Sequence, residues 1–186
     1  MSGCAKHASA PSYAAKLPGK IVQSLNDEVV FVGEDDRLRD VLHEVCSATG
    51  MGFAAIARVT EQQWIACQVV DKIDFGVDPG DELKIRQTIC DEIRDSGEAV
   101  VFDDASDDIK WSRHPVPVIY GFKSYASFPV YLDDGTFFGT LCAIDPEPRK
   151  VNDDAIIALF TALAKKVGHI LSERQGVSAN ILAQPA

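Results

Sequence analysis

The side chains best suited to redox, nucleophilic or metal chemistry are scattered along this chain. They are five cysteines and four histidines: Cys4, Cys46, Cys67, Cys90, Cys142, His7, His43, His114 and His169. The cysteines are odd in number and none belongs to a Cys-x-x-Cys pair, so neither a disulfide framework nor a zinc ribbon is expected. The histidines add no recognisable metal-ligand spacing. The sequence therefore predicts no metal site.

Acidic side chains gather in one short run, at Asp103, Asp104, Asp107 and Asp108. Neighbouring carboxylates can hold a cation or share a proton, but this run lacks the spacing of a calcium-binding EF-hand loop. A solvated acidic loop is the commoner explanation of such a run. The chain also lacks a nucleophile elbow, a P-loop and a dinucleotide fingerprint. We therefore expect no catalytic activity from this chain.

Cys90 is the cysteine whose role is most open. Ile85, Ile89 and Ile93 recur every four residues, which is typical of one face of a helix, and Cys90 lies beside them. A thiol there could sense oxidants or attach a ligand covalently. We favour packing, because structural cysteines are commonly buried and inert. Cys142 lies in a strand-like run and is interpreted in the same way.

Composition narrows the classes of partner. The chain has 186 residues, with 18 Lys and Arg against 28 Asp and Glu, a formal net charge of −10. This surplus argues against binding to nucleic acid and to anionic membrane surfaces. No apolar run approaches the roughly 20 residues of a membrane helix, and the N-terminus lacks the apolar region of a secretory signal. We expect a single cytoplasmic domain.

Hydrophobic periodicity predicts three helices and five strands. The domain should span residues 27–173, between a flexible tail at 1–20 and a frayed tail at 174–186. Asn152 is the expected N-cap of the last helix. The expected elements are a helix near 34–49, strands at 52–59 and 64–70, a helix at 85–96, a strand at 98–102, a crossover at 103–121, strands at 122–132 and 136–145, and a final helix.

This order predicts an α+β fold built on an antiparallel sheet of five to six strands. Two pairs of strands are joined by short links and read as hairpins. The two terminal helices can cover one face of the sheet. The middle helix and the long crossover must cover the other face, or that face would stay wet.

Several segments, among them Thr88–Ile93, Ser124–Pro129 and Asp134–Pro146, together resemble a GAF domain of the type found at the front of sensor histidine kinases and cyclic-di-GMP proteins. The resemblance covers roughly residues 27–173 with matching element order. It implies a six-stranded antiparallel sheet with a pocket under the crossover. The matching pieces are 59–67, Thr88–Ile93, Val100–Asp104 with Asp107 and Asp108, His114-Pro115, Tyr120–Phe122, Ser124–Pro129 and Asp134–Pro146.

The resemblance also implies a function. GAF domains bind small molecules such as cyclic nucleotides, bilins, haem and metabolites, and report the bound state through their terminal helices. We expect a sensory domain for an unknown small molecule or partner, acting as a homodimer, with a histidine kinase or cyclic-di-GMP enzyme as output in trans. A covalent bilin is not expected, because residues 103–122 contain no cysteine. Haem bound through His114 is the cofactor alternative.

The best pocket candidates combine apolar walls with a few polar tips. Strand alternation places Tyr125 and Ser127 on one face, opposite Ser124, Ala126 and Phe128. Plain core packing is the competing interpretation. The candidate ligand-pocket residues are Cys90, Trp111, His114, Tyr120, Phe122, Tyr125 and Ser127.

Two other functions remain open at this stage. One is a thiol-based redox sensor or an enzyme like the free methionine sulfoxide reductase, which shares the GAF fold, using Cys90. The other is a ligand-free dimerisation module. In that case Ile157, Leu159 and Ile170 of the last helix would supply apolar side chains to a dimer seam.

Overall fold

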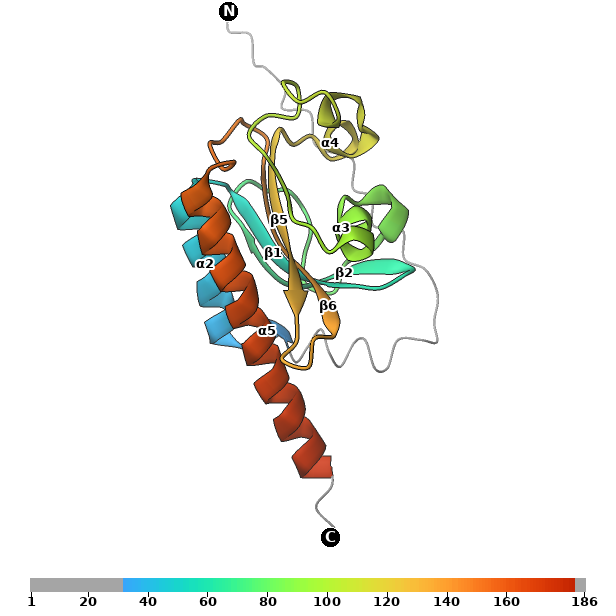
Figure 1. The fold of residues 1–186 in the computed structure, drawn as a ribbon, viewed down its shortest axis with the longest axis vertical. Helices are drawn as coiled ribbons and strands as arrows, with labels where there is room; N and C mark the ends of the chain where they lie inside the picture. Colours follow the sequence, from blue (N-terminus) through green and yellow to red (C-terminus); the bar gives the residue numbers. More distant parts are fainter. Residues whose placement is uncertain (1–31, 183–186) are drawn as a thin grey trace, which may run out of the picture.

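The computed structural model describes residues 32–182, which form an α+β fold around a six-stranded antiparallel sheet (Figure 1). The strand order is β3-β2-β1-β6-β5-β4. This is the architecture predicted from the sequence. The elements are α2 (Asp36–Thr49), β1 (Phe53–Val59), β2 (Gln63–Asp71), β3 (Glu82–Lys84), η1 (Ile85–Gln87), α3 (Cys90–Ser96), β4 (Val100–Phe102), η2 (Trp111–Arg113), α4 (Pro115–Tyr120), β5 (Ser124–Tyr131), β6 (Phe137–Asp145) and α5 (Asp154–Leu182).

Both predicted hairpins are present and they meet at the centre of the sheet. β1 pairs with β2 in the first, and β5 pairs with β6 in the second. The two hairpins join where β1 pairs with β6, from Phe53 opposite Ile144 to Arg58 opposite Gly139. The short strands β3 and β4 then form the two edges.

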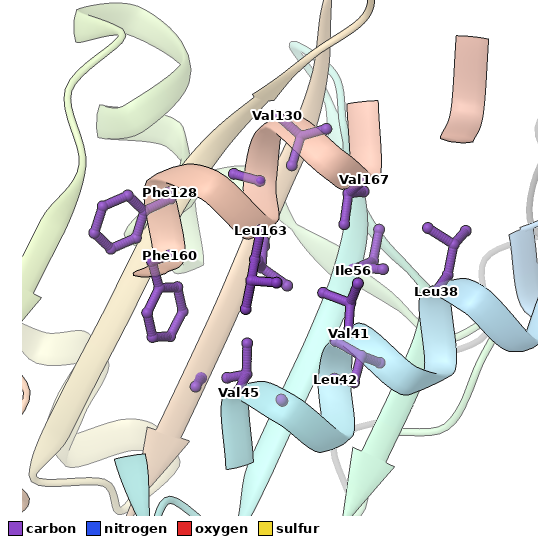
Figure 2. Packing of buried hydrophobic residues seen from close by; sticks show 14 of the residues in the cluster. Leu38, Val41, Leu42, Val45, Ile56, Phe128, Val130, Phe160, Leu163 and Val167 are labelled. Carbon is purple, nitrogen blue, oxygen red and sulfur yellow. The ribbon is translucent and has the colours of Figure 1, made fainter. Parts of the chain in front are cut away.

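The terminal helices α2 and α5 lie side by side on one face of the sheet (Figures 1 and 2). Leu38, Val41, Leu42 and Val45 of α2 are fully buried there, as the helical spacing predicted. They pack with side chains of α5 and the sheet into one hydrophobic cluster. Across this interface Phe128 of β5 stacks on Phe160 of α5, with ring centroids 5.0 Å apart.

The opposite face of the sheet carries a second hydrophobic cluster under α3, η2 and α4. β1, β5 and β6 contribute to both clusters, because successive side chains of a strand point to opposite faces. Tyr125 belongs to the second cluster, whereas Ala126 and Phe128 belong to the first. The predicted division of β5 between the two faces is confirmed.

The middle helix is shorter than predicted and a strand was missed. Helical spacing of Ile85, Ile89 and Ile93 indicated one helix from residue 85, but α3 begins only at Cys90. Thr88 is extended (φ −131°, ψ 152°) and separates η1 from α3. The edge strand Glu82–Lys84 carries a single apolar residue, Leu83, which is too little alternation to reveal a strand.

Both terminal helices begin after an aspartate whose side chain caps the first turn. Asp35 is the N-cap of α2, and Gly50 ends that helix in the left-handed region at φ 70°. The expected N-cap Asn152 of α5 is wrong. Asp153 takes that place, because its Oδ1 accepts from the backbone N–H groups of Ala155 and Ile156.

α5 is longer than the sequence indicated, since it continues to Leu182 and projects beyond the sheet (Figure 1). Its extension enters the segment expected to be a frayed tail. Gly176 is the weakest helix former between Arg174 and Leu182, and no proline stands in this segment to stop the helix. The expected flexible tail at 1–20 lies outside the described residues.

The part of α5 from Asp154 to Arg174 is long and apolar enough to cross a membrane by length and composition, with a mean hydropathy of 1.5. Its apolar side chains have a different use in this fold. Phe160, Leu163 and Val167 are buried against the sheet (Figure 2). This packing accounts for part of the apolar character of the helix.

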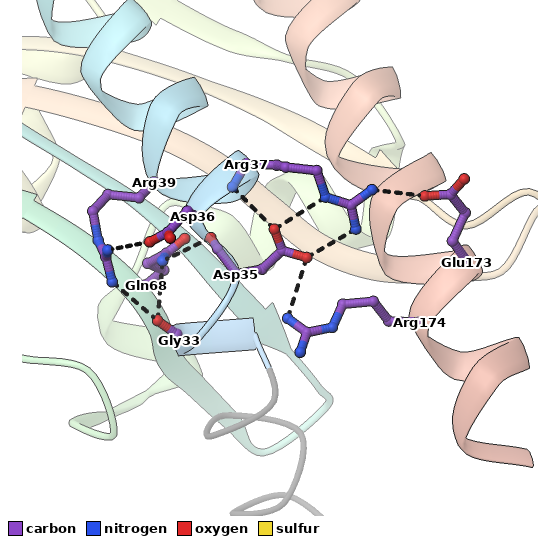
Figure 3. Close-up of polar contacts among 8 residues, drawn as sticks. All are labelled: Gly33, Asp35, Asp36, Arg37, Arg39, Gln68, Glu173 and Arg174. Carbon is purple, nitrogen blue, oxygen red and sulfur yellow. Dashed lines mark hydrogen bonds and ion pairs between the residues drawn. The ribbon is translucent and has the colours of Figure 1, made fainter. Parts of the chain in front are cut away.

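An ion-pair network ties the start of α2 to α5 (Figure 3). Asp35 is only 8% exposed and pairs with Arg37 at 2.9 Å and with Arg174 of α5 at 3.2 Å. Arg37 reaches Glu173 of α5 at 2.9 Å. Gln68 of β2 donates to the backbone oxygen of Asp35, which joins the network to the sheet. The hydrogen bond from Arg37 lowers the pKa of the Asp35 carboxyl.

Asp35→Asn should lower the free energy of unfolding by about 1 kcal/mol at pH 7, because asparagine keeps the N-cap but not the charge. Because folding lowers this pKa, the carboxylate stabilises the folded state at pH values above the unfolded pKa. This stabilisation is lost as the pH falls through the folded pKa. The deficit should therefore begin to shrink below about pH 4 and disappear only below the folded pKa, which is lower than that. Urea denaturation of wild type and variant at several pH values measures it, with Asp36→Asn as the exposed control. An equal deficit at all pH values would contradict this role.

Gly168 lets α5 lie directly on the end of β5. A Cβ at this position would stand 1.9 Å from the backbone oxygen of Tyr131. Gly168→Ala should therefore lower the free energy of unfolding by about 1–3 kcal/mol, although alanine is the better helix former. Urea denaturation measures the change. A more stable variant would show that the helix can move away without loss.

Candidate functional site

A small cavity of about 60 Å³ lies between the sheet and its α3–α4 cover. Its floor is formed by β1, β2, β5 and β6, and its walls by α3, α4 and the loop between β2 and β3. We call this loop, residues 72–81, the cover loop. The residues around the cavity are Phe53, Trp64, Phe75, Val77, Leu83, Thr88, Ile89, Cys90, Val116, Tyr120, Phe122, Tyr125, Cys142 and Ile144.

Cys90 is brought to the cavity by the start of α3 and is 3% exposed. Its Sγ lies 3.3 Å from Thr140 Oγ1, 3.6 Å from Tyr125 Oη and 4.0 Å from Ser127 Oγ. Burial raises the pKa of the Cys90 thiol, and the hydrogen bond with Thr140 opposes that shift only in part. The thiol is thus protonated at neutral pH and a poor nucleophile.

Cys142 of β6 also lines the cavity, so the fold brings together Cys90 and Cys142, which lie far apart in the sequence. Cys142 Sγ donates to the backbone oxygen of Ala55 at 3.6 Å. Burial raises the pKa of this thiol well above its ordinary value, and the nearby Cys90 raises it further. Among the described residues, no cation acts on either thiol to activate it.

The cover loop closes one side of the cavity with alternate side chains. Ile73, Phe75 and Val77 are half-buried while the residues between them are exposed. Phe75 lies against Phe53, with ring centroids 4.8 Å apart, and its ring centroid lies 6.3 Å from that of Tyr120 of α4. The loop therefore packs on the second cluster in the manner of a strand, although it forms none.

Four of the seven predicted pocket residues line this cavity: Cys90, Tyr120, Phe122 and Tyr125. Ser127 follows Tyr125 by two residues in β5 and is buried beside Cys90. Burial raises the pKa of Tyr125 well above its ordinary value, so its hydroxyl stays neutral. The predicted pairing of Tyr125 and Ser127 on the α3 side of the sheet is correct.

Trp111 and His114 lie outside the cavity. Trp111 stacks on Phe102 with ring centroids 5.1 Å apart, and borders a separate surface hollow of about 380 Å³. His114 Nδ1 accepts from the backbone N–H of Val116 and so caps α4, while its Nε2 lies 3.6 Å from Glu92 Oε1. Both side chains hold the crossover in place.

The sequence interpretation missed the floor and the cover loop. Phe53 and Trp64 lie in strands that were predicted. The sequence of a single strand, however, does not reveal which segments cover its face, so these two residues were not recognised as part of the cavity floor. The cover loop did carry a signal, since Ile73, Phe75 and Val77 alternate with polar residues and glycine. That period of two indicates a segment lying on a hydrophobic surface.

The acidic run has structural uses. Asp103 Oδ1 accepts from the backbone N–H groups of Val151 and Asn152, which fixes the segment before α5. Asp104 accepts from Ser106, and Asp108 accepts from the backbone of Lys110 and Trp111. Within residues 32–182 no group of three metal-ligating side chains could hold an ion.

Comparison with known proteins agrees with this geometry. The family model of the GAF domain matches residues 34–171, so the chain belongs to the GAF domain family. No match was found among curated protein sequences.

Solved structures share the fold at low sequence identity, so they inform about fold alone. The GAF domain of the Acinetobacter phosphoenolpyruvate-protein phosphotransferase is 17% identical, with a TM-score of 0.62, over 86% of this chain and 92% of that one. The PixJ GAF domain of Thermosynechococcus elongatus is 13% identical, with a TM-score of 0.61, over 87% and 95%. The free methionine-R-sulfoxide reductase of Neisseria meningitidis is 18% identical, with a TM-score of 0.57, over 85% and 87%.

Cys90 and Cys142 should resist alkylation in the folded protein, because both thiols are buried and protonated at neutral pH. Labelling with iodoacetamide, followed by peptide mass spectrometry, should be at least about 100-fold slower than in concentrated urea. The unfolded chain is the control for intrinsic reactivity. Rapid modification of Cys90 in the folded protein would instead indicate an activated thiol.

Proposed function

We propose that this chain is a sensory and regulatory GAF domain that binds a small molecule in the cavity, catalyses no reaction, and reports the bound state through α2 and α5. The observation that carries this proposal is the shared sheet. Neighbouring residues of β5 serve both faces, with Tyr125 at the cavity and Ala126 in the helix-side cluster. A ligand that displaces β5 therefore also moves the surface on which α5 packs.

The route from the cavity to α5 is short. Phe128 lies on the helix-side face of β5, three residues after Tyr125, and stacks on Phe160 of α5. α5 also contacts α2 through the Asp35 network (Figure 3). A shift of β5 can thus alter the seating of α5, and the ion pairs then couple that shift to α2.

Output through α5 to a second copy of the chain, and from there to a histidine kinase or cyclic-di-GMP enzyme in trans, is part of this proposal. It is supported by the projection of α5 beyond the sheet (Figure 1). The dimer seam first expected needs correction at one position. Ile170 is 4% exposed within the helix-side cluster, so it is not available to a partner, whereas Ile157 and Leu159 are only partly buried.

A thiol-dependent reductase is the alternative that the structural likeness to methionine sulfoxide reductases raises. That likeness concerns the fold alone. Free methionine sulfoxide carries an ammonium and a carboxylate, and among the described residues no charged side chain lines the cavity. The raised pKa of the Cys90 thiol also disfavours attack on a sulfoxide. These observations favour the sensory function.

Filling the cavity should change the hydrogen exchange of α5. Val116 of α4 is 4% exposed and faces the cavity, so Val116→Phe places extra atoms where a ligand would lie. Hydrogen exchange of the α5 amides over 154–174, measured by mass spectrometry, should change by roughly twofold or more relative to wild type.

Val118→Phe is the matched control, because Val118 is on the same helix but 79% exposed. This variant should leave exchange in α5 unchanged. Equal α5 exchange in wild type and both variants, with Val116→Phe folded, would contradict coupling between the cavity and the terminal helices.

A further inference from the structure

The cavity wall has no charge and almost no free hydrogen-bonding capacity. Among the described residues, those that line it are aromatic, aliphatic, cysteine and threonine side chains. Thr88 Oγ1 already donates to the backbone oxygen of Ile85 at 2.8 Å, and Cys142 Sγ donates to Ala55. Cys90 Sγ is held by Thr140 and Tyr125. A ligand in contact with these groups finds their polar atoms engaged.

This chemistry discriminates strongly against charged ligands. A carboxylate, ammonium or phosphate moved from water into such a site loses its hydration without gaining a counter-charge. Aromatic and aliphatic walls instead offer dispersion contacts, which favour any apolar molecule of matching size. The selectivity of the cavity is therefore for neutral and apolar ligands.

The volume sets a limit on size. An engineered apolar cavity of about 150 Å³ takes up benzene or xenon, and stays dry when empty. At about 60 Å³ this cavity is less than half as large. It accommodates about three to five non-hydrogen atoms without displacing its walls.

The cover loop is fixed in a way that opposes enlargement. The Asp71 carboxylate accepts from the backbone N–H groups of Ile73 and Gly76, at 3.0 and 3.1 Å. Phe75 is packed between Phe53 and Tyr120. A ligand too large for the space inside must break these contacts before it gains its own, so the cavity favours small molecules.

We infer that the cavity binds a neutral apolar molecule of about three to five non-hydrogen atoms, such as a short hydrocarbon, by shape and dispersion alone. This inference rests on the proposed function, since it names the class of ligand for the same cavity. It distinguishes this cavity from sites for nucleotides, amino acids and tetrapyrroles, which need room and polar partners that these walls do not supply.

The test compares size-matched probes on the wild-type chain. Xenon and cyclopropane represent the proposed class, and acetate and methylammonium represent charged molecules of similar size. Methyl NMR resonances of Ile89, Val116 and Ile144 should shift and saturate with xenon and cyclopropane, and should not respond to the two ions. Saturable binding of an ion, or no response to either apolar probe, would overturn the inference.

The paired α4 variants locate the binding. Val116→Phe should weaken xenon binding about tenfold or more, because the ring occupies the space, while Val118→Phe should bind as wild type. Equal xenon binding by wild type and a folded Val116→Phe would place the probe elsewhere and overturn the inference. Should Val116→Phe not fold, the comparison of apolar and charged probes on wild type decides alone.

Failure of this inference is distinguishable from failure of the proposed function. If α5 exchange responds to Val116→Phe but no apolar probe binds, coupling stands and the ligand class is wrong. If apolar probes bind but α5 exchange never changes, the ligand class stands and the sensory coupling is wrong.

Discussion

One sheet with both faces buried is the constraint on which the structure depends. β1, β5 and β6 must supply apolar side chains to two separate hydrophobic clusters, one under α2 and α5 and one under α3 and α4. A strand in this position cannot shift for one cluster without disturbing the other, because its side chains alternate between faces. The proposed function uses this link, since a change on the cavity side would displace the surface on which α2 and α5 pack.

The cavity and the helix network fit this constraint. The cavity is a part of the second cluster where apolar walls border unfilled space. On the other face, Gly168 brings α5 onto the backbone of Tyr131, and Asp35 joins α2 to Arg174. In the proposed function, these helices respond to a ligand on the cavity side. A thiol enzyme would need charged and activated groups at the cavity, and the walls supply neutral ones.

The sequence predicted the layers of this fold well, because α2, α5 and the two hairpins carry long periodic patterns. It failed where the signal was short or non-local. β3 has one apolar residue, the 85–96 helix was drawn too long across the extended Thr88, and Asp153 replaced Asn152 as a cap. Of the predicted pocket residues, Cys90, Tyr120, Phe122 and Tyr125 line the cavity, whereas Trp111 and His114 support the crossover. Their role in binding a ligand stays a prediction. Phe53 and Cys142 were missed, because their meeting across strands depends on tertiary packing.

The proposed function requires that a molecule in the cavity changes the packing of α5. The most direct measurement is methyl NMR of the wild-type chain under xenon pressure, following Ile89 at the cavity together with Val167 and Leu171 on the helix side. The account predicts that both groups of resonances change with the same xenon dependence, because β5 and β6 link them. Saturation of the Ile89 signal with no change at Val167 and Leu171 would contradict it.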